Sequence, residues 1–258
     1  MANSTLNGFK SFLIEMGEIS RFTGRFFAEV FKPRYEIREF FKQCFLIGYK
    51  SLPLTGVTAF IMGLVLTMQS RPTLAEFGAE SWLPAMVAVS LVREIGPVIT
   101  ALICAGKIGS SIGAELGSMK VTEQIDAMEV SGTNPFKFLV VTRVLATTFT
   151  IPILVIISDG IAMYGSYLGI NMKGVTSPHI FLAHVFNKLS YGDLLPAFIK
   201  TFFFGFAIGI VGCYKGYNSN KGTEGVGESA NSSVVVASLL VFILDLMAVQ
   251  VADLLGLT

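Results

Sequence analysis

The sequence is poor in charged residues: 14% of its 258 residues are Asp, Glu, Lys or Arg, against about 25% in an average soluble domain. Hydrophobic residues make up 52%, and the mean hydropathy is +0.66. A net charge of +1 argues against the strongly basic face that nucleic-acid binding usually requires. The scarcity of charge is not that of a soluble domain, and it predicts an integral membrane protein.

Cysteine, histidine and the common catalytic motifs are also scarce. The three cysteines form no CxxC pair and stand in or near apolar segments, as small buried hydrophobic residues do. His179 and His184 are five residues apart, a spacing that does not suit two metal ligands on one helical face. No HExxH or GxSxG motif is present. We expect no catalytic residue, metal site or cofactor in this chain.

The stretch AGKIGSS (residues 105–111) superficially resembles a phosphate-binding loop. That motif needs Gly where Ala101 stands, and it needs Ser or Thr, to hold magnesium, where Ile108 stands. Nucleotide binding by this route is therefore excluded.

Five apolar segments are long enough to cross a bilayer, which takes about 20 mostly apolar residues. The second and third are too long for one straight span and are expected to tilt or extend past the bilayer. We therefore expect an all-α membrane protein in which residues 51–258 form a five-span domain. The segments cover residues 51–69, 82–108, 138–170, 194–214 and 233–255.

Residues 1–50 differ from the rest, because their apolar residues recur at helical spacing between basic ones. An amphipathic helix that is basic, aromatic and too charged to span is typical of the membrane interface. The alternative is that the same stripe packs on protein. The stripe consists of Phe9, Phe12, Leu13, Met16, Ile19, Phe22, Phe26, Phe27 and Val30.

Lysine and arginine are distributed unevenly about the predicted spans. Fourteen of the 19 lie in residues 1–50 or in and beside the connections from span two to three and from span four to five, whereas the opposite loops hold three. Because these residues collect in cytoplasmic loops, we expect a cytoplasmic N-terminus and, after five spans, a C-terminus on the opposite side.

The connection between spans two and three, VTEQIDAMEVSGTNPFKF (residues 121–138), is polar and acidic. Thr122 is suited to cap the start of a helix, and Gly132 to end it. A helix of about three turns would place Ile125 and Met128 on one face and the acidic residues on another. We expect it to dock on a cytoplasmic partner; a solvated connector is the alternative.

Small residues recur at every fourth position in and after the second span, a pattern that lets helix backbones approach closely in lipid. It predicts helix packing, either within one subunit or between two. The ladder consists of Ala101, Ala105, Gly109, Gly113 and Gly117.

Arg93 and Glu94 stand about 15 Å into the second span, near the bilayer centre. Charges at this depth are costly and usually face a bundle interior or a wet cavity. We expect the pair either to form buried ion pairs or hydrogen bonds with Asp159, Lys200 or Asp245, or to form the polar wall of a substrate cavity.

The segment GTEGVGES (residues 222–229) fills the second connection on the cytoplasmic side. Its glycines predict a flexible turn. It is either a plain loop or a second docking contact, formed by Glu224, Gly225, Gly227 and Glu228.

Three of these features together resemble the MlaE (YrbE-type) permease family, the membrane subunits of bacterial ABC transporters that move phospholipids. They are EQIDAMEVSGTNP at residues 123–135, the ladder that leads into it, and GVGESANSSVVVAS at residues 225–238. The resemblance covers nearly the whole chain.

The resemblance implies a homodimer of permeases in the bacterial inner membrane, each on a cytoplasmic ABC ATPase that binds ATP and magnesium. It also implies a periplasmic hexamer of MCE-domain protein and a STAS-domain protein on the ATPase. Phospholipid would pass between the inner and outer membranes through a cavity bordered by Arg93 and Glu94, which would maintain outer-membrane lipid asymmetry. The implied coupling helix comprises Glu123, Gln124, Asp126, Ala127, Met128 and Glu129.

The rival hypothesis is an ion- or proton-coupled secondary carrier that uses Asp159 and Asp245 within the membrane. Such carriers often contain internal repeats. The halves of this chain show no convincing repeat, and an odd number of spans fits one poorly.

Overall fold

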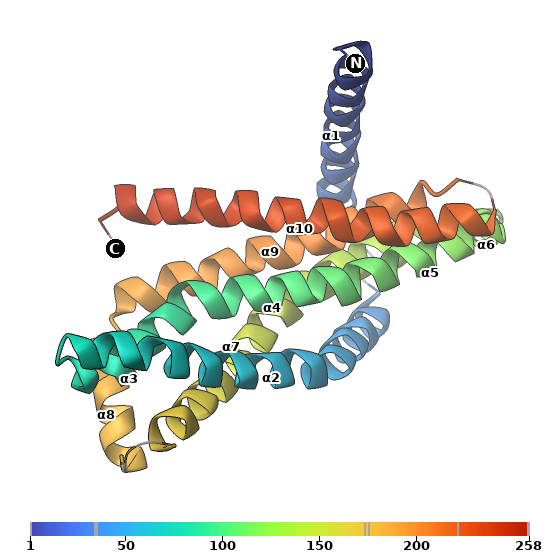
Figure 1. The fold of residues 1–258 in the computed structure, drawn as a ribbon. Helices are drawn as coiled ribbons and strands as arrows, with labels where there is room; N and C mark the ends of the chain where they lie inside the picture. Colours follow the sequence, from blue (N-terminus) through green and yellow to red (C-terminus); the bar gives the residue numbers. More distant parts are fainter. Residues whose placement is uncertain (1, 34–35, 173, 175, 221, 257–258) are drawn as a thin grey trace.

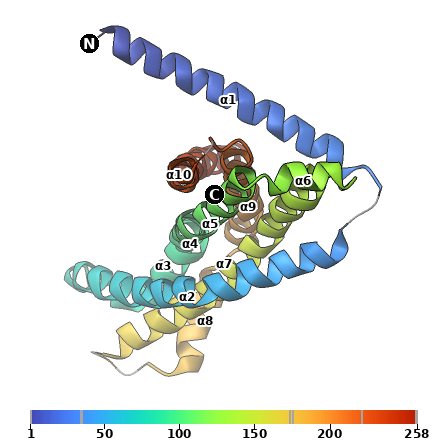
Figure 2. The same ribbon diagram turned by 90° about the vertical axis from the view of Figure 1, so that its right-hand side faces the viewer.

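The computed structural model describes residues 2–33, 36–172, 174, 176–220 and 222–256, and the side chains from residue 14 onward within these ranges. The described chain is helical throughout its regular elements and contains no strand. Five of its helices are long and apolar enough to cross a membrane, which is the number that the sequence predicts. They lie side by side along the length of the molecule, with the third span inclined to the others (Figures 1 and 2).

Each span is a longer helix than the apolar segment that predicts it, because helical geometry continues into the polar flanks. The largest difference is at α2, which begins at Ile37 although the first span was expected to begin at residue 51. The predicted division between residues 50 and 51 therefore runs through a continuous helix. The five spans are Ile37–Glu76 (α2), Glu80–Val121, Phe136–Asn171, Tyr191–Tyr217 (α9) and Thr223–Leu254 (α10).

The second span changes its helical winding twice. Its α-helical parts α3 (Leu83–Ser90), α4 (Gly96–Cys104) and α5 (Ser110–Val121) are separated by two π-helical segments, η2 (Leu91–Ile95) and η3 (Ala105–Gly109). η2 ends directly before Gly96 and Pro97. Since Pro97 has no N–H to donate, the regular α-helical bonding cannot continue through this turn.

The third span, formed by η4 (Phe136–Val141) and α7 (Thr142–Asn171), is the most enclosed of the five. It packs between α2 and α9. Glycine permits the close approach to α2, because a Cβ on Gly63 or Gly165 would overlap backbone atoms of the facing helix. Thr67 of α2 donates a hydrogen bond to Ser166 of α7 at 2.8 Å, so these two buried hydroxyl groups at the contact between the helices are hydrogen-bonded to each other.

Helix α1 (Ala2–Val30) runs crosswise to the spans at one end of the bundle (Figures 1 and 2). Ile19, Phe22 and Phe26 are buried, and the Phe22 ring lies 5.0 Å from that of Phe136 in η4. Phe27 stays exposed. The described part of the aromatic stripe thus packs largely on protein. Its remaining members Phe9, Phe12 and Leu13 lie outside the described side chains.

The two ends of the bundle carry different elements. The helix α6 (Gln124–Val130), the start of α10 and the base of α1 gather at one end, whereas α3, α8 (Pro178–Lys188) and the end of α10 lie at the other (Figure 1). The segments that are rich in lysine and arginine therefore share one end of the molecule.

Candidate functional site

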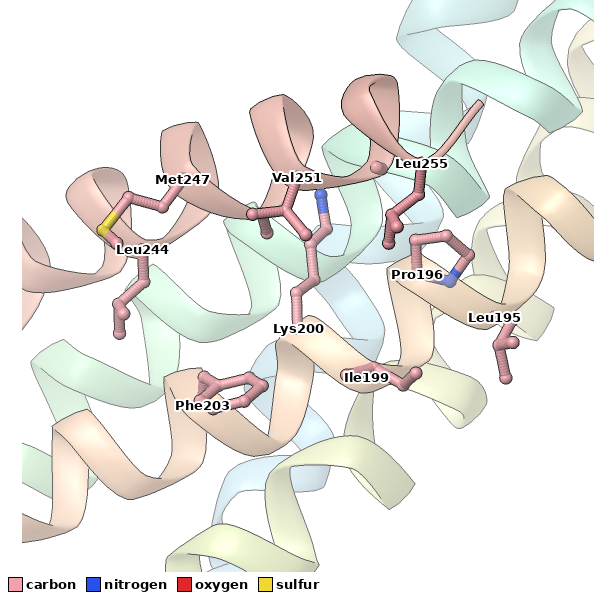
Figure 3. A pocket seen from close by; sticks show the side chains of 11 residues that line it. Leu195, Pro196, Ile199, Lys200, Phe203, Leu244, Met247, Val251 and Leu255 are labelled. Carbon is pink, nitrogen blue, oxygen red and sulfur yellow. The ribbon is translucent and has the colours of Figure 1, made fainter. Parts of the chain in front are cut away.

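A groove of about 370 Å³ opens between α9 and α10 (Figure 3). Its residues belong to the start of α9 and the end of α10, in the half of the bundle remote from α6 (Figure 1). Its lining residues recur every three to four positions on both helices, so each helix turns one face toward the groove. Apart from one lysine, every lining side chain is apolar. The lining consists of Leu195, Pro196, Ile199, Lys200, Phe203, Leu244, Met247, Ala248, Val251, Ala252 and Leu255.

Lys200 forms the inner wall of this groove, and its side chain rises from α9 between the two helices (Figure 3). Only 4% of the side chain is exposed. The ammonium group donates hydrogen bonds to Glu94 of η2 at 2.7 Å and to Asp245 of α10 at 2.9 Å. A buried charge is tolerated only when it is paired and hydrogen-bonded, so the two carboxylates explain how the lysine can lie there.

Arg93, the neighbour of Glu94, faces a different partner. Its guanidinium lies 3.6 Å from a carboxylate oxygen of Asp193, in the first turn of α9. Asp193 also forms a capping box with Ser190, which fixes its position at the helix start. Arg93, Glu94 and Asp193 line a second, smaller cavity of about 20 Å³ that adjoins the groove and shares Lys200 with it.

The groove and the smaller cavity adjoin each other, so an apolar surface lies next to the charged side chains of Arg93, Glu94 and Lys200. Arg93 and Glu94 each remain more than a third exposed, whereas Lys200 is buried beneath them. Sites of this kind, mostly apolar with a few placed polar groups, orient a ligand by its polar end. The geometry suits a molecule with a long apolar part and a charged head.

Asp159, the third partner considered for Arg93 and Glu94, lies apart from this cluster. Its carboxyl group touches Gly96 on α4 and lines a cavity between α2, α4 and α7. No hydrogen bond joins it to either residue among the described contacts. The contacts of the pair therefore involve Lys200, Asp245 and Asp193. Sequence reasoning missed Asp193, although Ser190 followed by Asp193 at the third helical position is the pattern of a capping box.

Helix α6 follows the second span at the opposite end of the molecule. It begins at Gln124, after Glu123 in a left-handed conformation (φ 58°), and has two turns rather than the expected three. Thr122 does not cap it; its hydroxyl donates to the carbonyl of Ser118 instead, because α5 continues to Val121.

The two faces of α6 differ in burial. Ile125 is buried and Met128 is half-buried against the core of the bundle. The other residues of the implied coupling helix form an exposed, acidic surface, and Asp126 makes an ion pair with Lys120 at 2.9 Å. The exposed residues are Glu123, Gln124, Asp126, Ala127 and Glu129.

The expected flexible turn at residues 222–229 is instead the start of α10, which begins at Thr223. Glu224 stands in the first helical turn, where the helix dipole favours an acidic residue. Gly225 is buried against the backbone of Asn220, and this packing outweighs the low helix propensity of glycine. Glu224, Gly227 and Glu228 are exposed at the same end of the molecule as α6.

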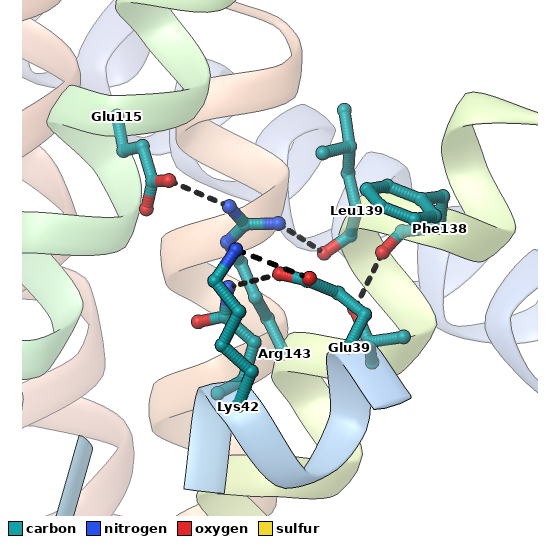
Figure 4. A network of polar contacts seen from close by, with 8 residues as sticks. Glu39, Lys42, Glu115, Phe138, Leu139 and Arg143 are labelled. Carbon is teal, nitrogen blue, oxygen red and sulfur yellow. Dashed lines mark hydrogen bonds and ion pairs between the residues drawn. The ribbon is translucent and has the colours of Figure 1, made fainter. Parts of the chain in front are cut away.

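A buried arginine connects the helices on either side of α6 (Figure 4). Arg143 of α7 donates to Glu115 of α5 at 2.8 Å and to the carbonyl of Leu139 at 3.0 Å. Glu39 of α2, which also binds Lys42, lies beside it (Figure 4). Arg143 is one of the fourteen basic residues that the sequence analysis counted in or beside the connections on the cytoplasmic side. Its position inside an apolar segment was the signal for a buried partner.

The small-residue ladder lies buried inside one chain, between α5, α9 and α10. A Cβ on Gly113 would meet the hydroxyl of Ser233 and the carbonyl of Ser229, and Gly109 and Gly117 also face α10 or the segment before it. Ala101 and Ala105 continue the buried row. Contacts within one subunit thus account for the ladder.

Comparison with known proteins places this architecture in a family. The family model described as "Permease MlaE" matches residues 40–251. A probable ABC transporter permease protein of Rickettsia felis is 38% identical over 243 residues, which cover 94% of each chain. A probable ABC transporter permease protein of Synechocystis is 35% identical over 86% of this chain and 84% of its own.

The "intermembrane phospholipid transport system permease protein MlaE" of Haemophilus influenzae is 37% identical over 206 residues, which cover 79% of this chain and 78% of that protein. Together with the five apolar helices, these matches make the chain a multi-pass membrane subunit of an ABC transporter. It belongs to the MlaE permease family.

Proposed function

We propose that this chain is the permease that carries phospholipids between the inner and outer membranes of a bacterium and so maintains the lipid asymmetry of the outer membrane. The observation that carries the proposal is the groove between α9 and α10, which ends at the charged cluster of Arg93, Glu94 and Lys200. A phospholipid has the matching division into acyl chains and a charged head. The name of the Haemophilus relative, which refers to intermembrane phospholipid transport, supports the same substrate.

The groove would bind the acyl part of the lipid, and the charged cluster would bind its head. The apolar walls, such as Phe203 and Met247, would hold an acyl chain, since each buried methylene contributes about 0.8 kcal/mol. The phosphate would approach the exposed guanidinium of Arg93 rather than Lys200, whose charge is already matched by two carboxylates.

Energy would come from a cytoplasmic ABC ATPase, which binds the ATP and magnesium, docked on the exposed face of α6. The acidic residues of α6 suit a basic groove on such a partner, and Glu224 and Glu228 offer a second contact at the same end. The Arg143–Glu115 pair joins α5 to α7 immediately behind α6, so a push on α6 would move both spans together.

A second copy of the chain would cover α10. This span is the least enclosed, with 11% of its most apolar window buried against 67% for the third span. It also exposes the amide of Asn231, and a polar side chain within a span favours a partner helix over lipid. On the strength of the family resemblance, we also propose a periplasmic MCE-domain hexamer and a STAS-domain protein as partners, and an inner-membrane location. The distribution of basic residues supports an N-terminus in the cytoplasm.

Lipid bound to the purified transporter tests the proposal. The complex is isolated from membranes, and its phospholipid is quantified by mass spectrometry. We expect Ala248→Trp, which places a large ring in both cavities, to lower lipid occupancy several-fold, and Arg93→Ala and Glu94→Ala to weaken it. Ile156→Trp on the exposed face of α7 is the matched control and should change nothing.

A lipid with a photoactivatable acyl chain gives an independent readout. Crosslinks are expected on α9 and α10. Unchanged occupancy in Ala248→Trp, together with crosslinks that avoid both helices, would show that the groove is not the lipid site.

A further inference from the structure

Asp159 and Ser158 form a buried polar site that the groove does not use. Oδ1 of Asp159 and the hydroxyl of Ser158 are both buried, and neither has a hydrogen-bond partner within the described residues. Ser158 is 1% exposed. Both line a cavity of about 10 Å³ between α2, α4 and α7, together with Thr58 and Thr100. Two orphan polar groups side by side in an apolar bundle need a physical explanation.

The facing helix is shaped to admit the carboxyl group. A Cβ on residue 96 would overlap Oδ1 of Asp159, so glycine at this position brings the carboxyl against the backbone of α4.

The cations on the surrounding helices already serve other carboxylates. Lys200 of α9 holds Glu94 and Asp245, and Arg93 of η2 faces Asp193. α4 carries no charged residue, α2 contributes only Thr58, Ala59 and Met62 to the cavity, and the other charged residue of α7, Arg143, binds Glu115 far along the helix. In the described part of the chain, Lys200 and Arg93 thus face the carboxylates of Glu94, Asp245 and Asp193, and no cation is in ion-pair contact with Asp159.

We infer that Asp159 is a proton-binding site. A carboxylate without a cation is far more costly to bury than a carboxylic acid. The carboxyl holds one proton in the folded bundle and gives it up to water when the protein unfolds. This inference does not depend on lipid being the transported molecule.

Infrared spectroscopy of the full-length protein in lipid nanodiscs observes the proton directly. We expect the C=O band of a protonated carboxylic acid, its shift on exchange into heavy water, and its loss in Asp159→Asn. The band should persist in Asp245→Asn. A band that survives Asp159→Asn but disappears in Asp245→Asn would move the proton to the Lys200 cluster and overturn the assignment.

Carbodiimide labelling needs no variant, so it decides the matter even if Asp159→Asn fails to fold. These reagents modify protonated carboxyls in apolar surroundings, and mass spectrometry should find the adduct on Asp159. Absence of both the adduct and the infrared band would refute the proposal.

The pH dependence of the melting temperature shows whether Asp159 is a neutral acid or an ionised carboxylate in the folded protein. A carboxyl that is neutral when folded and ionised when unfolded loses stability as the pH rises. Asn removes this dependence, so Asp159→Asn should lose less melting temperature than the wild type as the pH rises from about 5 to neutral. An equal loss at every pH would indicate an ionised, structurally bound carboxylate instead.

Discussion

Glycine sets how closely individual helices of this bundle approach, and its effect depends on what lies opposite. At Gly113 a Cβ would stand 2.6 Å from the hydroxyl of Ser233 and 2.9 Å from the carbonyl oxygen of Ser229. The second atom belongs to the backbone of α10 and cannot move without shifting that helix. At Gly160 on α7 nothing lies within 4 Å of the same position.

Alanine at these two glycines should therefore have opposite effects. Gly113→Ala should destabilise the protein by about 1–3 kcal/mol, the usual range for overpacking. Gly160→Ala should be neutral or stabilise by up to about 1 kcal/mol, because alanine is the better helix former. Thermal unfolding in detergent measures both, and equal losses would show that the ladder does not pack against α10 as described.

The sequence identifies the unusual residues of the site more readily than their partners. The depth of Arg93 and Glu94 follows from counting along an apolar segment. The partner of Glu94, Lys200, lies 106 residues away, and no local pattern encodes that pairing. Lys200 itself, near the end of its apolar segment, was equally compatible with reaching toward the membrane surface, and only the packing of α9 against α10 buries it.

Among the α-helices, α6 is the shortest that the proposed function requires. It buries Ile125 and exposes its acidic side chains, so substitutions on the exposed face should leave the fold intact. Its ion pair between Asp126 and Lys120 is solvent-exposed, and such pairs contribute less than about 1 kcal/mol. If substitutions on this exposed face abolish function, the cause would therefore be the loss of contact with a partner and not a loss of protein stability.

We expect the double variant Glu123→Ala, Asp126→Ala to insert normally in the membrane but to lose most of its co-purifying ATPase or its lipid transfer. The matched control removes two carboxylates at the other end of the bundle, Glu76→Ala with Glu80→Ala, and should retain both. Affinity purification from membranes and a lipid-transfer assay measure the outcome. Full ATPase recovery with undiminished transfer in the first variant would contradict a coupling role for α6.

The elements themselves are well predicted by hydropathy, and their ends are not. Five apolar segments give five spans because the bilayer requires about 20 apolar residues of each. Helices nevertheless extend beyond that requirement: α10 begins at Thr223 within a glycine-rich stretch, where packing against Asn220 overrides propensity. The left-handed Glu123 likewise makes α6 begin at Gln124, one residue later than a cap at Thr122 would.

At the scale of the whole molecule, the two ends of the bundle differ in charge and in the work proposed for them. The end with α6 and the start of α10 collects the basic flanking segments, while the residues that line the groove belong to the start of α9 and the end of α10, toward the other end. The distribution of lysine and arginine predicts that the first of these ends is cytoplasmic. An ATPase can act only on that side, so orientation is the condition on which the rest of the proposed mechanism depends.

Cysteine accessibility in whole cells tests this orientation. In a variant with Cys44, Cys104 and Cys213 replaced by alanine, Asn187→Cys on α8 should react with a membrane-impermeant maleimide once the outer membrane is opened. Ser131→Cys, directly after α6, should react only after the inner membrane is also disrupted. Both positions are exposed, so neither result depends on burial. The reverse pattern would place α6 outside the cytoplasm, where no ATPase could drive it, and the proposed coupling would have to be abandoned.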